Sequence, residues 1–531
     1  MKEIYLHFCL LLTFIVAGCD KSSTDVPEPQ KEQQFGEVTV LGSRLNNPYA
    51  LANMQAVSKI TLEANCLYVR FLPKDDRDIY LLQMKEIHLY DYPLDYELAV
   101  IGRSYHDPSL SEDAITWQYA AVPSDFEFPD VQYEILEKCY IPTDNERELE
   151  EAAFINAGYG NAGATKAGVG GKMPLSARLE IFNDNEHGTI EPLRGVKVCW
   201  RLFIKEEYGI SDSDGRISIP ESKFSLNDGP VPEASIIFEN DNCSIWKNLS
   251  CINAVSVNLG PQSEVVCLFA PDATASTDNE CGYVITDMWD MGIISNATFD
   301  YLEFCRDKGI LAPPSDLKIW DWTFLGSSSA SMIRRVNGYE GGKVTSFAKA
   351  LLDTLSQRTG IEGLDRVLPD LTIGTFYTRY DGYKGDCYRI IYKATWHELT
   401  HSSHYSQAGD DVWAKYIDYI VKYGAYGNGT VKPGDETGKT GMDICELGEC
   451  WAYANEHYRQ KELFNRDQNT LSTGEWFFVH YQSICKVMDN GVLTREEMYK
   501  CLTPDVKSYA DFKSALKLRY PGASDKLDEL L

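Results

Sequence analysis

Basic residues are scarce in this chain compared with acidic ones. Lys and Arg total 50 against 79 Asp and Glu among 531 residues, which gives a formal net charge of −29. A surface that binds nucleic acid needs a basic patch, and no cluster of Lys and Arg is seen, so the sequence argues against nucleic acid as a partner. Long apolar runs are also lacking: after the first 19 residues, no segment is apolar enough to cross a membrane.

The N-terminal segment has the features of an export signal. In residues 1–19, MKEIYLHFCLLLTFIVAGC, Lys2 precedes an apolar run that is too short for a permanent membrane span but suits a signal peptide. The last residues, VAGC, resemble a bacterial lipobox. This resemblance implies cleavage before Cys19, lipid attachment to its thiol, and anchoring at the bacterial cell envelope, in the outer membrane or at the cell surface. Plain secretion is the alternative.

The rest of the chain is too long for one compact core, so several domains are expected. The sequence changes in character along its length. Short β-rich runs come first, such as CLYVRFLP and IYLLQ, and stretches rich in Gly and Ala and segments with helical periodicity follow. They predict an α+β multidomain protein with an N-terminal α+β domain, a small β-sandwich and a mainly helical C-terminal domain with a short β-sheet. The predicted parts are a flexible tether (20–35), the N-terminal domain (36–153), a Gly/Ala-rich linker (154–176), the β-sandwich (177–241) and the helical domain (242–531).

The predicted β-sandwich carries a resemblance of its own. Strand-like runs, among them GVKVCWRLFIKEEYGIS and GRISIP joined by the turn SDSDG, make it similar to the transthyretin-like modules found beside carboxypeptidases. The resemblance implies a rigid accessory module that carries no chemistry. The β-sandwich, the lipobox and the Tyr and Asp content together make the chain similar to lipid-anchored proteins of Bacteroidetes.

Cysteine is plentiful, but its pattern does not predict a disulfide framework. Without Cys9 and Cys19, thirteen of the fifteen cysteines remain, an odd number without tight CxxC pairs. Cys305, Cys445 and Cys485 fall inside helical apolar patterns, where a free cysteine serves as a small core residue. The connectivity is therefore left open.

The segment KATWHELTHSSHYSQ concentrates three of the nine histidines. No Gly or Pro interrupts the chain from Asp386 to Ala408, so a helix is expected, and His397 and His401 then lie one turn apart on one face, close enough to share an ion. Glu398 lies about 100° around the helix. It is poorly placed as a ligand but well placed to contact a water molecule bound to the metal, as in HExxH sites.

A catalytic zinc usually has three protein ligands, and several residues were considered for the third. The metzincin pattern is excluded because Gln407 stands where its histidine would be. His404 lies about 10 Å along the helix from His397, so one ion can hardly reach both without a bend. Glu446 and Glu449 lie one turn apart on an otherwise apolar helix, where a carboxylate is costly unless it is paired or bound to a metal.

The stretch ELGECWAYANEHY resembles the glutamate helix of gluzincin-type metallopeptidases. Gly448, Glu449 and Ala452 match that pattern, and Glu456 corresponds to a second acidic residue found in some members, whereas Cys450 and Tyr453 depart from it. The resemblance implies that Glu449, in preference to Glu446, completes a zinc site with His397 and His401. It also implies that the helical domain (242–531) is a zincin-like catalytic domain of a metallopeptidase.

The sequence thus predicts a zinc metallopeptidase that hydrolyses extracellular proteins or glycoproteins, with Glu398 as the catalytic base. Candidate donors to the oxyanion are Tyr405, His457, Tyr458 and His480. The expected partners are a protein or peptide substrate and, through Cys19, the membrane. The alternative is a surface protein that binds glycans or peptides, with a structural metal or none.

Overall fold

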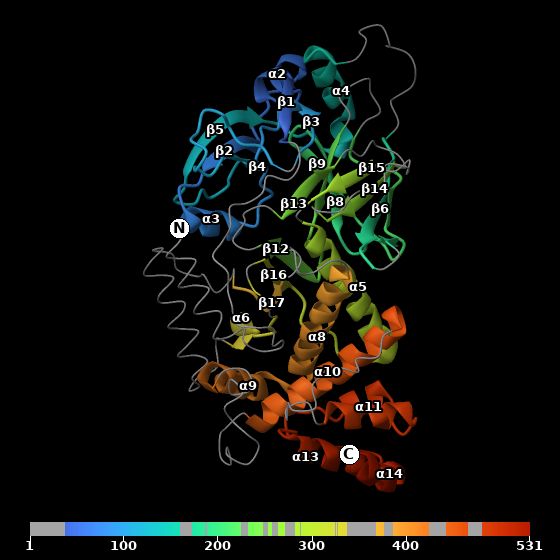
Figure 1. The fold of residues 1–531 in the computed structure, drawn as a ribbon. Coiled ribbons are helices and arrows are strands. Elements are labelled where there is room, and N and C mark those ends of the chain that lie inside the picture. Colours follow the sequence, from blue (N-terminus) through green and yellow to red (C-terminus); the bar gives the residue numbers. More distant parts are fainter. Residues whose placement is uncertain are drawn as a thin grey trace.

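The structure is a computed structural model of the chain. It describes residues 38–102, 104–159, 172–185, 188–224, 232–247, 253–257, 264–270, 282–286, 288–323, 325, 328–336, 368–375, 386–423, 442–465 and 480–531. The predicted signal peptide with Cys19, the tether, and residues 160–171 of the predicted linker lie outside the described residues. Helices and several separate sheets are both present, as an α+β prediction requires (Figure 1). Within the described part, no helix combines the length and apolar character of a membrane span.

The N-terminal part contains two small antiparallel sheets and three helices. One sheet pairs β1 with β3, and the other has the strand order β4-β2-β5. The elements are β1 (Val40–Arg44), α2 (Leu51–Val57), β2 (Cys66–Leu72), α3 (Asp76–Gln83), β3 (Tyr96–Val100), β4 (Gln118–Pro123), β5 (Gln132–Cys139), the 3-10 turn η1 (Asp144–Glu146) and α4 (Arg147–Asn156).

One of the β-rich runs predicted here is wrong. The sequence IYLLQ belongs to helix α3, not to a strand. The carboxylate of Asp75 accepts a hydrogen bond from the backbone N–H of Asp78 at 3.2 Å and so caps the helix. Ile79 and Leu82, three positions apart, are both buried on one side of it. The cap, which precedes the apolar run, decides between helix and strand.

His88 connects this N-terminal part to the strands that follow. Its Nε2 lies 3.2 Å from Glu239 and its Nδ1 lies 3.4 Å from Glu206. Burial lowers the pKa of His88, but these two carboxylates outweigh burial and raise it to about 9.

The raised pKa of His88 predicts a pH-dependent stability. Below about pH 6.5 the imidazole is charged in the folded and unfolded states, and its ion pairs contribute fully; this contribution falls as the pH rises and is lost above about pH 9. We expect the free energy of unfolding of the wild type to fall by up to about 3 kcal/mol relative to His88→Gln between pH 6.5 and 9.5. Chemical denaturation of both proteins across this range measures the difference, and parallel curves would contradict the assignment.

Two sheets follow in the middle of the chain. One has the order β10-β6-β14-β15 with β7 paired to β6, and the other has the order β13-β11-β8-β9. Buried side chains of both sheets, such as Ile181 and Trp200, belong to one core. The strands are β6 (Leu175–Asn183), β7 (Thr189–Pro192), β8 (Lys197–Leu202), β9 (Lys205–Ile210), β10 (Arg216–Ile219), β11 (Glu233–Ile237), β13 (Ala254–Val257), β14 (Glu264–Phe269) and β15 (Gly282–Ile285).

Strand pairing in these sheets crosses the predicted boundary at residue 241. Strand β14 pairs in parallel with β6, and β13 pairs with β11, although β13 and β14 come from the segment assigned to the helical domain. The runs of residues 177–241 are strands as predicted, but their sheets are completed by residues from further along the chain.

A third sheet, β12-β16-β17, is entirely parallel and lies between these sheets and the C-terminal helices (Figure 1). Its strands are β12 (Cys243–Lys247), β16 (Leu317–Trp322) and β17 (Leu371–Gly374). Helix α5 (Trp289–Lys308) packs on β12 and runs beside α8 (Cys387–Ala408). Among its buried residues is Cys305, as predicted for a small core residue.

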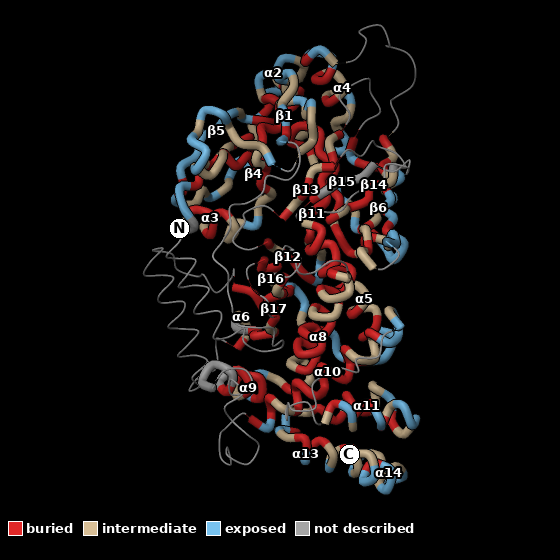
Figure 2. The backbone as a smooth tube through the Cα atoms, in the orientation of Figure 1, coloured by how far each residue is buried: buried red, intermediate tan, exposed pale blue. Residues whose placement is uncertain are grey.

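The C-terminal part is helical, as its periodicity predicts. Helix α10 (Met442–Phe464) contacts α8, α9 (Asp410–Tyr423), α11 (Tyr481–Asp489) and α13 (Tyr509–Arg519). Cys445 and Cys485 are buried among these helices. The remaining helices are α6 (Ile333–Val336), α12 (Arg495–Tyr499), η6 (Pro521–Ala523) and α14 (Ser524–Leu530). Figure 2 shows α8 and the middle of α10 as almost continuously buried.

Candidate metal centre

The start of helix α8 is fixed by the residue that follows strand β6. The carboxylate of Asp184 accepts hydrogen bonds from the backbone N–H groups of Cys387 at 2.8 Å and Tyr388 at 2.7 Å. These are donors of the first turn, which have no partner inside the helix. A negative charge at this end also interacts favourably with the helix dipole. The β6 sheet therefore determines where the histidine helix begins.

One face of α8 is held against α5 by aromatic side chains at four-residue spacing. The rings of Tyr388, Tyr392 and Trp396 stack along this face. Trp396 also packs edge-to-face on Tyr301 of α5, with ring centroids 4.8 Å apart. The hydroxyl of Tyr392 donates a hydrogen bond to Asp300 of α5 at 2.8 Å. With this face fixed, the next positions around the helix, which include His397 and His401, are directed toward α10.

The structure brings His397, His401 and Glu449 together as a group that can bind a metal ion. The Nε2 atoms of the two histidines lie 3.1 Å apart, and carboxylate oxygens of Glu449 lie 3.4 Å from His397 Nε2 and 3.5 Å from His401 Nε2. A tetrahedral ion with bonds of about 2.0–2.1 Å separates its ligand atoms by about 3.3 Å. Glu449 faces His397 with Oε2 and His401 with Oε1, so the two nitrogens and this carboxylate lie at distances close to those between ligand atoms around one such ion.

Burial and charge also suit a cation at this point. All three residues are buried, with at most 2% of their surface exposed. Burial raises the pKa of Glu449, but the charges and hydrogen bonds of the two histidines outweigh burial and lower it well below its usual value. Burial lowers the pKa of His397, yet hydrogen bonds with Glu449 and Glu456 raise it to about 10, while burial leaves the pKa of His401 lowered. The carboxylate thus stays charged inside the protein, where it attracts positive charge.

Further residues hold the ligands in position. The Nδ1 atom of His397 lies 2.9 Å from Oε2 of Glu456. The other carboxylate oxygen of Glu456, Oε1, lies 3.2 Å from Nζ of Lys393. An outer carboxylate of this kind directs the other ring nitrogen toward a metal and increases its basicity. On α9, the hydroxyl of Tyr416 donates a hydrogen bond to Glu449 Oε1. The ring of Tyr453 packs against His397 with centroids 4.5 Å apart.

Small residues on α10 leave room for side chains of α8 and α9 beside the ligand group. A Cβ atom at Gly448 would lie 3.2 Å from the ring of Tyr416 and 3.8 Å from His404 Nδ1, so glycine leaves room for both side chains. Ala452, one turn beyond Gly448, is fully buried. Both residues belong to the pattern that identified the glutamate helix.

The other candidate ligands have different surroundings. Glu446 lies 3.6 Å from His480 Nε2, and burial together with the charge of Asp443 raises its pKa to about 7. His404 is buried beside Trp413, and burial lowers its pKa to about 3, so it stays neutral. Among the described residues, the group with metal-ligand spacing includes Glu449 and neither Glu446 nor His404.

The candidate oxyanion donors make contacts outside this group. The Tyr405 hydroxyl donates to Asp410 at 2.7 Å, and the Tyr458 hydroxyl donates to Asp489 at 2.6 Å. His480 stacks on Tyr509, and His457 packs near Tyr458 and Tyr481. Their role in binding an oxyanion stays a prediction. The sequence did not predict the contacts that Tyr416, Tyr453 and Trp413 make with the group.

Comparisons with protein-family models, curated proteins and solved structures find no match for this chain. The likeness to gluzincins therefore depends on the residues quoted from α8 and α10. The geometry of His397, His401 and Glu449 is independent of that likeness.

The contact between Glu456 and His397 predicts an effect on metal affinity. Replacing Glu456 by Gln removes the charge that orients and polarises the imidazole, so we expect metal binding to weaken by about 10–100-fold. Competition with a chromophoric chelator measures this change. Glu462→Gln, on the exposed end of the same helix, is the matched control and should leave the affinity unchanged. Equal affinities of the two variants would contradict the role of Glu456.

Proposed function

We propose that the chain is a zinc-dependent metallopeptidase with His397, His401 and Glu449 as zinc ligands and Glu398 as the general base. The observation that carries this proposal is the buried group of two imidazoles on α8 and a carboxylate on α10. The two Nε2 atoms lie 3.1 Å apart, each lies 3.4–3.5 Å from an oxygen of Glu449, and Glu398 lies on α8 beside the histidines. Two nitrogens and one oxygen, with a fourth position open, form the ligand set of catalytic zinc sites.

The chemistry divides between the ion and the chain's own residues. A zinc ion bound there lowers the pKa of water toward about 7 and polarises a carbonyl group. Glu398 accepts the proton of the attacking water and then transfers it to the leaving amine, which requires a carboxylate beside the ligands and not among them. Glu398 is 1% exposed, and its charge contributes to the raised pKa of His397, which supports a position close to the ligand group.

The surrounding residues keep this arrangement fixed. Glu456 orients the ring of His397, and Tyr416 orients the carboxylate of Glu449. A site whose ligands are fixed before substrate binds needs little rearrangement during the reaction. Stabilisation of the oxyanion is proposed for one of Tyr405, His457, Tyr458 and His480.

Substrate and location are proposed from the sequence. The signal peptide and Cys19 support a lipid-anchored protein of the bacterial cell envelope, and such a location favours extracellular proteins, glycoproteins or their peptides as substrates. The acidic composition supports the expectation that nucleic acid is not a partner.

Cleavage of an unbiased peptide mixture tests the proposed function. The purified full chain, loaded with zinc, is incubated with peptides from a digested proteome, and new termini are identified by mass spectrometry. We expect zinc-dependent cleavage that a chelator abolishes and added zinc restores. Intact peptides after incubation with protein shown to carry one zinc per chain would overturn the peptidase proposal.

A further inference from the structure

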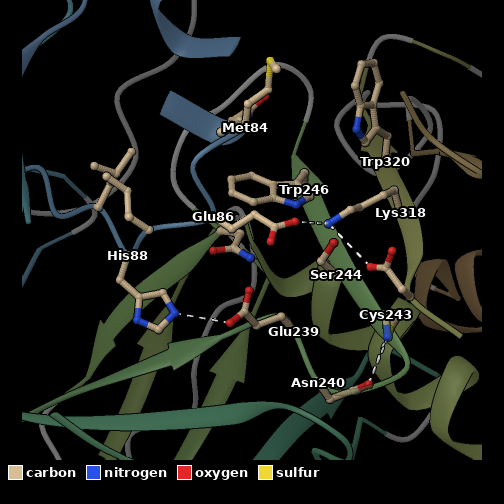
Figure 3. A pocket seen from close by; sticks show the side chains of 15 residues that line it. Met84, Glu86, His88, Glu239, Asn240, Cys243, Ser244, Trp246, Lys318 and Trp320 are labelled. Carbon is tan, nitrogen blue, oxygen red and sulfur yellow. Dashed lines mark hydrogen bonds and ion pairs between the residues drawn. The ribbon is translucent and has the colours of Figure 1, made fainter. Parts of the chain in front are cut away.

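A pocket of about 400 Å³ lies where three separate parts of the chain meet (Figure 3). One wall is the segment after α3 that contains Glu86 and His88. A second wall contains Glu239 and Asn253, from the ends of strands in the β13-β11-β8-β9 sheet. The floor is the β12–β16 strand pair. Its volume is in the range of small-molecule binding sites.

The floor of the pocket is one face of the parallel sheet. Ser244 pairs with Lys318, and Trp246 pairs with Trp320, in the register of β12 and β16. Residues two apart on a strand share a face, so these four side chains lie on the same side of the sheet. The next residue of β12, Lys247, points to the other side, where it lies 2.8 Å from Asp290 of α5. The pocket is therefore on the side of this sheet away from α5.

Charges in and around the pocket are balanced by ion pairs. Lys318 lies 3.6 Å from Glu86 and 3.6 Å from Asp316. His88 lies between Glu239 and Glu206, at 3.2 and 3.4 Å. Each of these two positive groups thus has two carboxylates beside it. Glu239 also pairs with Lys197, and Asp316 with Arg334, so four positive groups stand against four carboxylates. A ligand without net charge fits this lining better than an anion or a cation.

Two buried polar atoms of the lining residues have no hydrogen-bond partner within the described part of the chain. They are the hydroxyl oxygen of Ser244 and the amide nitrogen of Asn253, residues that are 8% and 7% exposed. Buried polar groups are rarely left unsatisfied, and each costs stability unless a ligand or water completes it. A hydroxyl can donate and accept hydrogen bonds and an amide N–H₂ donates them, so a ligand that both accepts and donates hydrogen bonds complements these two groups.

We propose that this pocket binds one neutral sugar unit of a glycan, at a site separate from the metal centre. A pyranose ring has a face of C–H groups that packs on an indole such as Trp246, and hydroxyls around its rim that pair with Ser244, Asn253 and the carboxylates. An extended peptide fits less well, because peptide recognition by a sheet uses an open strand edge. Here the floor is a sheet face, and the backbone of Ser244 is already bridged to Glu239.

Binding of simple glycosides to the full chain tests this site. The probes are methyl glycosides of glucose, galactose, mannose, N-acetylglucosamine and N-acetylgalactosamine, followed by tryptophan fluorescence and calorimetry. We expect saturable binding of at least one of them. Trp246→Ala should weaken it by at least about tenfold, and Ser244→Ala and Asn253→Ala by about 3- to 10-fold each. Tyr133→Ala, an exposed aromatic on β5, is the matched control and should bind as the wild type does.

Several results would overturn the sugar site. They are the absence of binding by every neutral glycoside, affinity unchanged in Trp246→Ala and Ser244→Ala, or binding only of charged sugars or of peptides. The Ser244→Ala change is small enough to keep the fold, which circular dichroism checks, so a misfolded Trp246 variant does not remove the test. Because the readout is binding and needs neither metal nor turnover, its outcome is independent of the peptidase proposal.

Discussion

Replacing Glu398 by Gln is expected to lower peptide hydrolysis by about 10²–10⁴-fold while the zinc content stays near one ion per chain. Glutamine has nearly the same shape but cannot accept the proton of the attacking water. Since Glu398 lies around the helix from His397 and His401, its replacement leaves the three proposed ligands in place. Steady-state rates and metal analysis on the same samples measure the two effects separately.

This variant also separates the two functions that the sequence left open. A surface binding protein would retain its ligand affinity in Glu398→Gln and would show no hydrolysis in either form. Glu462→Gln, far along α10 and partly exposed, serves as the control and should hydrolyse at the wild-type rate. Hydrolysis that persists in Glu398→Gln would show that another group acts as the base.

The second large effect is expected for the choice between two glutamates one turn apart. Glu449→Ala should weaken zinc binding by more than about 100-fold, because loss of even an outer partner of a ligand costs about 10–100-fold. Glu446→Ala should leave the affinity unchanged, since its carboxylate lies beside His480 and not beside His397 or His401. Zinc titration of both variants under identical conditions makes the comparison.

The matched pair makes this prediction specific. Both substitutions replace a glutamate of α10 by alanine and so remove the same side-chain atoms. Any general effect on the stability of α10 should therefore be similar in the two variants. Equal losses of zinc would point to distortion of the helix. Loss of zinc in Glu446→Ala alone would show that Glu446, and not Glu449, is the ligand.

The sequence predicted the helix of the site because its signals are local. Without Gly or Pro between Asp386 and Ala408, α8 forms over Cys387–Ala408, and four-residue spacing then fixes where His397 and His401 point. Carboxylates on an apolar helix are costly, which made Glu446 and Glu449 candidates, and the resemblance to the gluzincin glutamate helix favoured Glu449. These inferences concern single helices and need little knowledge of the surrounding fold.

Contacts between elements could not be predicted in the same way. Tyr416 lies in an amphipathic helix whose aromatic residues look like ordinary core positions, and only the packing of α9 against α10 brings its hydroxyl to Glu449. The role of Asp184 as the cap of α8 connects residues about two hundred positions apart. The parallel pairing of β14 with β6 likewise depends on long-range topology, which is why the boundary at residue 241 does not separate the sheets.

The proposed sugar pocket is a clearer example of a feature that the sequence could not predict. Its walls come from three distant segments, and nothing in the sequence around Ser244 or Asn253 distinguishes them from other polar residues near strands. They stand out only because the fold buries them beside a cavity, where Ser244 Oγ and Asn253 Nδ2 find no hydrogen-bond partner among the residues that the structure describes.

The most direct test of the metal centre is an anomalous-difference map from crystals of the zinc-loaded full chain, with data collected on both sides of the zinc absorption edge. We expect one strong peak about 2.0–2.2 Å from His397 Nε2, His401 Nε2 and a carboxylate oxygen of Glu449. A well-ordered map with no peak at these three residues, or with zinc bound only elsewhere, would contradict this expectation.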